Sequence, residues 1–306
     1  MKILVTGAAG LIGSHLCDIL INKDHEVTGI DDLSYGNVRN LHSKINFIED
    51  KVENIFKYEE RYDVIYHLAS LKKVWDGSIY SSDVMLTNFL MTDAITKKAL
   101  RDGSKLIFAS TSDIYGNSKT FLESDNLTMG PPGNRRYSYA LSKWHSEQYI
   151  LNTSLEEGAL LKAVIVRVFG CASSRSNTSW SGGHVPLFID LASNNEDILI
   201  HGEGLQTRSI SHALDIAEGF SNCLDIKNEI INLGTDQQTT VKYVAEYIVN
   251  KLNSTLRIKY IPKEKIFKNY NEIMVRFANT DKAKKLINYK VNYTTEQVID
   301  GIIRSL

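Results

Sequence analysis

Short apolar runs alternate with amphipathic segments through the first half of the chain. The apolar runs predict β-strands at residues 3–5, 26–30, 45–48, 64–68, 105–109 and 163–168. The spacing of apolar residues between them predicts helices at residues 14–20, 88–99 and 139–151. Strands that alternate with helices in this way form parallel β-α-β units. We therefore expect an α/β fold, a doubly wound parallel sheet with ligand sites at the carboxyl ends of its strands.

This alternation weakens from about Gly170 onward. Helical patterns follow at residues 185–192, 215–224, 241–252, 281–287 and 295–303, and strand patterns at 198–201 and 256–261. We expect a first domain over residues 1–169, completed by segments returning from the C-terminal half. Residues 170–306 are then mainly a smaller mixed lobe that roofs the cleft, with one or two strands (163–168 among them) returning to the main sheet.

The first strand breaks into a turn that contains Gly7, Gly10 and Gly13. Gly7 permits the tight turn, Gly10 lets a pyrophosphate approach the backbone, and Gly13 lets helix and strand pack closely. The N–H groups at the start of the following helix are open to an anion. The order of strand, glycine turn and helix is typical of a Rossmann-like dinucleotide-binding fold, although three glycines also occur in ordinary strand-to-helix turns.

Acidic residues follow the second and third predicted strands. Asp31 and Asp32 lie about 20 residues beyond the glycine turn, where a carboxylate accepts hydrogen bonds from the adenosine ribose. Such a carboxylate would repel the extra phosphate of NADP, so Asp31 favours NAD, and the alternative is a solvated acid that ends a strand. Asp50 is placed to contact the edge of the adenine.

Composition narrows the class of protein. The 306 residues are 43% hydrophobic and 23% charged, as in ordinary soluble enzymes, and the formal net charge of −1 gives no sign of binding to nucleic acid or to an anionic membrane. No apolar run of about 18 residues occurs, and the first strand begins beside Met1, which leads us to expect a cytoplasmic protein. Cys17, Cys171 and Cys223 are too widely spaced to suggest a metal site.

The fifth predicted strand runs into a polar stretch, Ser110–Gly116, where a substrate would lie, although a plain polar loop explains the composition equally well. Further along, Tyr139 and Lys143 are four residues apart and share one helical face. A tyrosine, with an ordinary pKa of about 10, can act as a general base if a nearby ammonium and a nicotinamide cation lower that pKa. Such a pair alone is common on helix surfaces, but with the glycine turn and the hydroxyl-bearing strand end it predicts hydride transfer.

These motifs occur in the order and at the spacing of a known family. TGAAGLIGSHL, GIDDLS, YHLAS, TSDIYG and YSYALSK are the most specific, and residues 167–170, 201–209, 232–234, Arg276 and Asp281 match more loosely. The chain resembles the extended short-chain dehydrogenase/reductases, in their NAD-dependent nucleotide-sugar epimerase/dehydratase branch, over essentially its whole length. The resemblance implies a retained, recycled NAD, a nucleoside-diphosphate sugar as substrate, and a catalytic trio of Thr111, Tyr139 and Lys143.

The glycine turn, the acidic residues and the resemblance together define a set of expected contacts. We expect NAD to contact Gly7, Gly10, Leu11, Ile12, Asp31, Asp32, Asp50, Leu68, Ala69, Lys72, Asn88, Tyr139 and Lys143. By the resemblance, Thr111 would contact the sugar, and Arg208 and Arg276 would meet the substrate diphosphate, which suits the bidentate geometry of guanidinium groups. For each arginine, an ordinary surface charge is the alternative. No metal site is expected.

The residues next to Thr111 distinguish the reactions of this family. Its 4,6-dehydratases have an Asp-Glu pair directly after the threonine, whereas this chain has Ser112 and Asp113. UDP-glucuronate decarboxylases have Thr-Ser-Glu, so Asp113 is one methylene shorter than their glutamate. We expect 4-epimerisation of a UDP-sugar first. The first alternative is decarboxylation of UDP-glucuronate, with Asp113 in the glutamate role and Arg208 near the carboxylate. A 4,6-dehydratase ranks behind it, and a non-catalytic NAD(H)-binding sensor is the alternative from another class.

Three further expectations follow from the resemblance and the local sequence. Gly170 replaces an asparagine that normally touches the substrate, so that either a neighbouring group substitutes or the sugar sits differently. The polar segment 176–184 reads as a mobile substrate loop. The helices at 88–99 and 139–151 would pack across a two-fold axis as a four-helix bundle, giving a homodimer.

Overall fold

A seven-stranded parallel sheet forms the centre of the molecule, with strand order β11-β6-β5-β4-β1-β2-β3. The computed structural model describes residues 1–72, 80–128, 130, 137–156, 161–178, 183–262 and 273–306. The strands of the sheet are β1 (Lys2–Thr6), β2 (Glu26–Asp31), β3 (Asn46–Glu49), β4 (Val64–His67), β5 (Lys105–Thr111), β6 (Lys162–Val168) and β11 (Glu229–Leu233). The predicted doubly wound α/β sheet is therefore confirmed.

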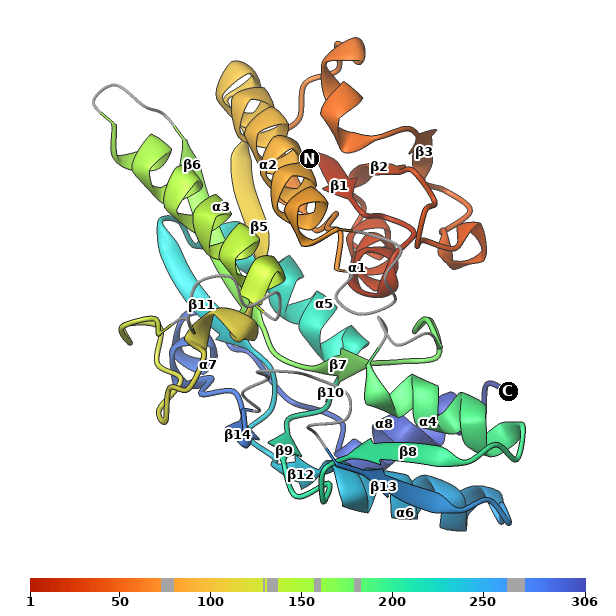
Figure 1. The fold of residues 1–306 in the computed structure, drawn as a ribbon. Helices are drawn as coiled ribbons and strands as arrows, with labels where there is room; N and C mark the ends of the chain where they lie inside the picture. Colours follow the sequence, from red (N-terminus) through yellow and green to blue (C-terminus); the bar gives the residue numbers. More distant parts are fainter. Residues whose placement is uncertain (73–79, 129, 131–136, 157–160, 179–182, 263–272) are drawn as a thin grey trace.

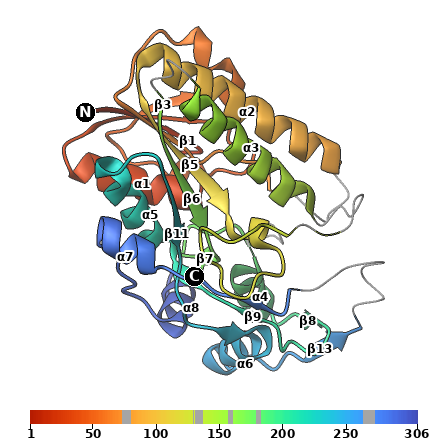
Figure 2. The same cartoon turned by 90° about the vertical axis from the view of Figure 1, so that its left-hand side faces the viewer.

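Helices cover both faces of this sheet (Figures 1 and 2). One face packs against α1 (Leu11–Asn22), α5 (Ala213–Asn222) and α7 (Asp281–Ile287); the other packs against α2 (Ser81–Asp102), α3 (Ser138–Leu155) and the 3₁₀ segment η2 (Val52–Lys57). Because successive strand residues point to opposite faces, Ile3 and Val5 are buried with α1 while Leu4 is buried with α2. None of the described helices is long and apolar enough to cross a membrane.

The predicted elements are present, and most differences concern their ends. Helix α2 begins at Ser81, seven residues before the predicted start at residue 88. The apolar pattern misses this start because the first turn of the helix is largely polar. Strand β5 continues through Ser110 and Thr111, which pair with β6. Strand β11 has no predicted range, since Glu229 and Asn232 interrupt its apolar pattern; with β6 it supplies the strands expected to return to the main sheet.

A smaller lobe lies below the carboxyl ends of the sheet strands in Figure 1. Its core joins the helices α4 (His184–Ser193), α6 (Val241–Leu252) and α8 (Thr295–Ile303). Its strands are β8 (Ile198–His201) with β13 (Ile258–Ile261), and β12 (Thr239–Thr240) with β9 (Thr207–Arg208) and β14 (Val275–Arg276). Strands β7 (Cys171–Ala172) and β10 (Ser211–His212) pair at the junction of the two parts.

A buried ion pair fixes α3 to the sheet. Arg167 on β6 donates from Nη2 to Glu147 Oε2 (2.8 Å) and from Nε to Glu147 Oε1 (3.1 Å), and its Nη1 donates to the Tyr115 hydroxyl (3.1 Å). Both charged side chains are almost fully buried. This bidentate geometry sets both the position and the rotation of the helix that carries Tyr139 and Lys143.

We predict that Glu147→Ala lowers the free energy of unfolding by about 3 to 5 kcal/mol, because it leaves the Arg167 charge buried and unpaired. Urea titration followed by circular dichroism measures the loss. The control is Lys97→Ala, which removes an exposed pair with Asp93 and should cost less than about 1 kcal/mol. Equal losses in the two variants would contradict the prediction.

Candidate active site

The glycine turn after β1 depends on two close backbone approaches. Gly7 has a φ of +72°, and a Cβ there would lie 2.8 Å from the Ala69 nitrogen. A Cβ on Gly13 would lie 2.1 Å from the Gly7 carbonyl oxygen. Helix α1 starts after Gly10 without a side-chain cap or an acidic residue in its first turn. Its positive end is therefore suited to an anion such as a pyrophosphate.

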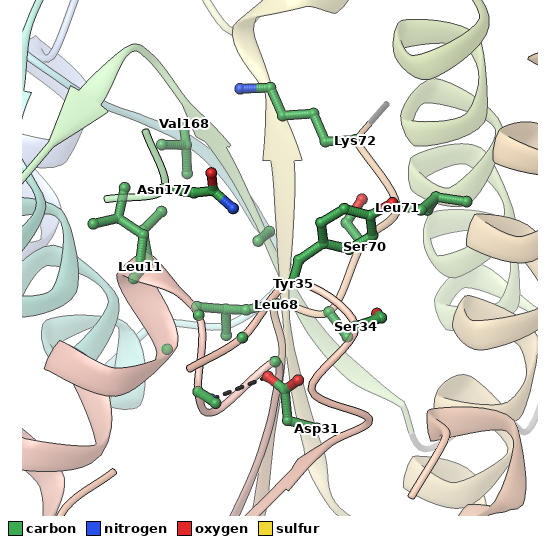
Figure 3. A pocket seen from close by; sticks show the side chains of 18 of the residues that line it. Leu11, Asp31, Ser34, Tyr35, Leu68, Ser70, Leu71, Lys72, Val168 and Asn177 are labelled. Atoms are coloured by element: carbon green, nitrogen blue, oxygen red, sulfur yellow. Dashed lines mark hydrogen bonds between the residues drawn. The ribbon is translucent and has the colours of Figure 1, made fainter. Parts of the chain in front are cut away.

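A cavity of about 1280 Å³ opens at the carboxyl ends of the sheet strands. Most of the predicted site residues line it, namely Gly7, Gly10, Leu11, Ile12, Asp31, Asp32, Leu68, Ala69, Lys72, Thr111, Asp113, Tyr139, Lys143 and Arg276. Figure 3 shows Leu11, Asp31 and Lys72 around this space. Residues from the glycine turn, from the ends of β2, β4 and β5, and from α3 are thus brought together at one place.

Asp50 is not among the residues that line the cavity, whereas the next residues, Lys51 and Val52, are. Its carboxylate accepts hydrogen bonds from the Asn54 amide (2.6 Å), the Tyr58 hydroxyl (3.0 Å) and the Lys51 backbone (2.7 Å). These donors, Asn54 first, lower the pKa of Asp50 to about 2. The Asp50 carboxylate therefore stabilises the segment that follows β3, from Lys51 to Tyr58.

Asn88 also lies outside the cavity lining. It accepts from the Leu71 nitrogen (2.7 Å), donates to the Leu71 carbonyl (3.0 Å) and donates to the Ser142 hydroxyl (3.0 Å). It thereby connects the segment after β4, which does line the cavity, to α3.

Arg208 is the third predicted residue outside the lining. Its Nη1 donates to the carbonyls of Thr207 and Ile273, both at 2.8 Å. Arg208 is in register with Arg276 on the neighbouring strand, but of the two arginines it is Arg276 that reaches the cavity.

Asp31 is 8% exposed and ends β2 beside the glycine turn. Its Oδ2 accepts from the Ala9 nitrogen (3.0 Å, dashed in Figure 3) and its Oδ1 from the Leu33 nitrogen (2.9 Å). Burial raises the pKa of Asp31, and the two backbone donors oppose that shift. The carboxylate is thus held in a fixed orientation at the edge of the cavity.

Tyr139 is half-buried at the edge of the cavity, where its surroundings favour the protonated phenol. Burial raises the pKa of its phenol to about 12, against a hydrogen bond with Ser70 that lowers it. The Lys143 ammonium donates to the Ala109 carbonyl (2.9 Å) and lies 4.6 Å from the centre of the Phe108 ring. Burial lowers the pKa of Lys143 to about 7, and Glu147 partly opposes the shift. The expected lowering of the Tyr139 pKa is therefore not supplied by the protein alone.

An ion pair between Asp113 and Arg276 lines the cavity beside Thr111. The Asp113 carboxylate bonds to Arg276, which reaches it from β14 in the smaller lobe. The Asp113 backbone nitrogen donates to the Thr111 hydroxyl (3.2 Å) and begins the 3₁₀ turn η3 (Ser112–Tyr115). Thr111, Asp113 and Arg276 therefore form one connected group.

The departure at Gly170 has a steric cause. A Cβ there would lie 2.6 Å from the Ser209 carbonyl oxygen, and the Ser211 nitrogen donates to the Gly170 carbonyl (2.9 Å). The backbone before β10 therefore occupies the space that an asparagine would need. In the predicted substrate loop, residues 176–178 line the cavity, while Trp180 and Gly182 lie outside the described residues.

Several lining residues have little signal in the sequence. Tyr35, Cys171 and Arg175 line the cavity but belong to none of the motifs named above. Ser70 also lines it and is the last residue of YHLAS, although no contact was expected of it from the sequence. The closest indication is that Ser70 follows a strand end, while Thr111 ends one.

The fold and the cavity together define an NAD-dependent enzyme of the Rossmann type.

The chain belongs to the NAD dependent epimerase/dehydratase family, whose profile matches residues 3–234. It is 31% identical to the UDP-N-acetyl-alpha-D-glucosaminuronate decarboxylase of Bacillus cytotoxicus, over 99% of this chain and 97% of that one. It is also 29% identical to a putative UDP-glucose 4-epimerase of Methanocaldococcus jannaschii, over 82% of each chain.

Solved structures of epimerases share the fold. The UDP-glucose 4-epimerase of Thermotoga maritima, solved with UDP-glucose, is 25% identical with a TM-score of 0.85, over 100% of this chain and 98% of that one. The UDP-N-acetylglucosamine 4-epimerase of Methanobrevibacter ruminantium, in complex with UDP-N-acetylmuramic acid, is 26% identical with a TM-score of 0.85, over 99% and 97%.

We predict that Lys143 makes the NAD-free protein more stable as the pH rises from about 7 to about 10. The folded pKa of Lys143 is about 7 and that of an unfolded lysine about 10.4, so the unfolded state binds more protons in this window and stability increases with pH. Urea titrations at pH 7, 8 and 9 should show this slope in wild type and not in Lys143→Met. Lys97→Met should keep the wild-type slope, and parallel slopes in all three proteins would refute the prediction.

Proposed function

We propose that this enzyme oxidises C4 of a UDP-sugar with its bound NAD, and that the same cofactor then returns the hydride to the opposite face, giving the 4-epimer. The observation that carries the proposal is the meeting of Thr111, Tyr139 and Lys143 in one cavity with the uncapped end of α1. The names of the relatives, which are enzymes of UDP-sugars, support it.

In this proposal each residue of the trio has one task. Tyr139 takes the proton from the sugar 4-hydroxyl, and Thr111 holds that oxygen by a hydrogen bond. Lys143 holds the nicotinamide ribose. NAD, when bound, supplies the hydride acceptor. Because burial raises the Tyr139 pKa to about 12, positive charge brought into the cavity favours the phenolate that acts as the base.

Epimerisation needs only this trio and room for a flat 4-keto sugar to turn over. Asp113 is paired with Arg276, so it is not held as an independent acid or base. The Ser112–Asp113 sequence also lacks the second acid that 4,6-dehydration requires.

Decarboxylation of a UDP-uronic acid is the second candidate. The specific observation in its favour is a carboxylate and a guanidinium beside Thr111, a pair that simple epimerisation does not need. A substrate carboxylate can replace Asp113 on Arg276, which faces the cavity in place of the expected Arg208. The relative from Bacillus cytotoxicus, a decarboxylase by name, supports this alternative.

We also propose how the chain is organised and assembled. Residues 1–169, with the returning segments, hold NAD, and residues 170–306 mainly bind the nucleotide sugar. A homodimer through α2 and α3 is supported by Met85, Leu86 and Leu90, which are 39%, 58% and 45% exposed on α2. A cytoplasmic location is supported by the free cysteines.

We predict that Tyr139→Phe lowers turnover by about 10² to 10⁴-fold, because it removes the proton acceptor, while NAD stays bound. The assay supplies UDP-glucose, UDP-N-acetylglucosamine, UDP-glucuronate and UDP-N-acetylglucosaminuronate separately, and detects 4-epimers, CO₂ and pentose products by mass spectrometry and NMR. Tyr149→Phe, on the same helix but outside the cavity, is the control. Full activity of Tyr139→Phe, or no turnover of any of these sugars by wild type, would count against the proposal, and the latter result would favour an NAD(H) sensor.

We predict that Asp113→Asn changes the rate of 4-epimerisation by less than about tenfold, because that reaction does not use the carboxylate. If the enzyme decarboxylates a uronate, the same change should lower CO₂ release by more than about 100-fold. Measuring both products with one variant therefore separates the two reactions.

A further inference from the structure

A short segment crosses the cavity beside the start of α1. Residues 173–178, which we call the strap, follow β7 and begin with a turn in which the Ser176 nitrogen donates to the Ser173 carbonyl (2.9 Å) and the Ser176 hydroxyl accepts from the Ser173 nitrogen (3.0 Å). Residues 174–178 of the strap line the cavity. Figure 3 shows Asn177 near Leu11, with its amide turned into the cavity.

Two side-chain contacts fix the strap to α1. The Ser173 hydroxyl lies 3.0 Å from His15 Nε2, and Arg175 Nη2 lies 2.7 Å from Asp18 Oδ2. Leu11, His15 and Asp18 are spaced four and three residues apart, so they lie on one face of the helix. The strap therefore follows the face of α1 that begins at its uncapped, anion-binding end.

The hydrogen bonds within this contact are mutually consistent. Burial, followed by the charges of Arg175 and His212, lowers the pKa of His15 to about 4. A neutral His15 can accept the Ser173 hydroxyl hydrogen, while the Ser173 oxygen accepts from the Arg175 backbone nitrogen (3.2 Å). Arg175 Nη1 is buried and has no hydrogen-bond partner in the part of the chain that is described. The guanidinium is held through Nη2, which donates to Asp18 Oδ2.

We propose that the Arg175–Asp18 pair is a latch that keeps the strap closed over the cofactor and slows the release of NAD. Arg175 and Asp18 are then positioning residues, which act through the strap and not by touching the reacting atoms. A dinucleotide whose pyrophosphate sits at the start of α1 has the glycine turn on one side and the strap on the other. Breaking the Arg175–Asp18 pair lets the strap move away from α1, which gives the dinucleotide a wider exit from the cavity.

Retention has a chemical consequence within the proposed reaction. The hydride removed from the sugar must return from the same cofactor, so a cofactor lost between the two half-reactions would leave an unreduced 4-keto sugar. The latch itself requires only that NAD binds at the glycine turn. It can therefore fail or hold whether or not the proposed sugar reaction is correct.

The test measures how fast the holoenzyme exchanges its bound NAD for radiolabelled NAD. We expect Arg175→Ala and Asp18→Ala each to speed exchange by about three- to fivefold, as loss of a partly exposed ion pair implies. The charge-swapped double variant, Asp18→Arg with Arg175→Asp, should bring the rate back toward that of wild type. Such rescue is not expected if the single variants merely damage the fold.

A matched control removes an ion pair elsewhere. Lys251 and Asp300 join α6 to α8 with an N–O distance of 2.9 Å, outside the cavity lining, so Lys251→Ala should exchange NAD at the wild-type rate. Wild-type exchange in both single latch variants would overturn the proposal. So would faster exchange in Arg175→Ala alone, since that would mean that Arg175 acts on NAD directly. Failure of the double variant to slow exchange would also overturn it.

Discussion

The geometry of the site depends on the buried ion pair between Glu147 and Arg167. Arg167 lies on β6 opposite Ser110 of β5, one residue before Thr111, and Glu147 lies one turn beyond Lys143 on α3. The pair therefore fixes the helix that carries the phenol and the ammonium against the strand that carries the hydroxyl. Because desolvation offsets much of the attraction in such pairs, its main contribution is the exact placement of α3. Burial lowers the pKa of Lys143 and the Glu147 charge partly opposes that shift, so that one carboxylate both anchors the helix and favours the charged lysine.

Much of the fold could be predicted because its signals are local. Apolar runs, the glycine turn and the 3.6-residue period are read within a few neighbouring residues, and they place β1, α1, β5 and α3 correctly. The apolar pattern does not predict strand β11, because Asn232 within it is polar and hydrogen-bonds in the interior to the Tyr115 hydroxyl and the Phe121 carbonyl. Asn232 is suited to this position by tertiary contacts, and the pattern of apolar residues along one strand carries no information about such contacts.

The residues of the site also fall into two groups, those that local sequence predicts and those that only the tertiary structure brings together. The glycines, Asp31 and the Tyr139–Lys143 spacing are local, and the structure brings these residues to one cavity. The pairing of Asp113 with Arg276 and of Arg175 with Asp18 joins residues more than 150 positions apart. The close approach of Ser209 to Gly170 also joins two separate segments, which lie just before β10 and β7. No spacing rule predicts such contacts, because they depend on how the smaller lobe is placed on the sheet.

An anion that binds at the start of α1 and one that binds at Arg276 face different competition from the protein's own side chains. At the start of α1 the positive end of the helix has no side-chain partner to displace, so an anion there replaces only water. At the other end, a diphosphate or a carboxylate that engages Arg276 must compete with Asp113. A ligand that wins this competition releases the Asp113 carboxylate beside Thr111, the residue that holds the sugar oxygen in the proposed reaction. Residue 113 therefore affects how tightly an anionic substrate binds, and a reaction that uses its carboxylate, such as decarboxylation, requires that this pair first be broken.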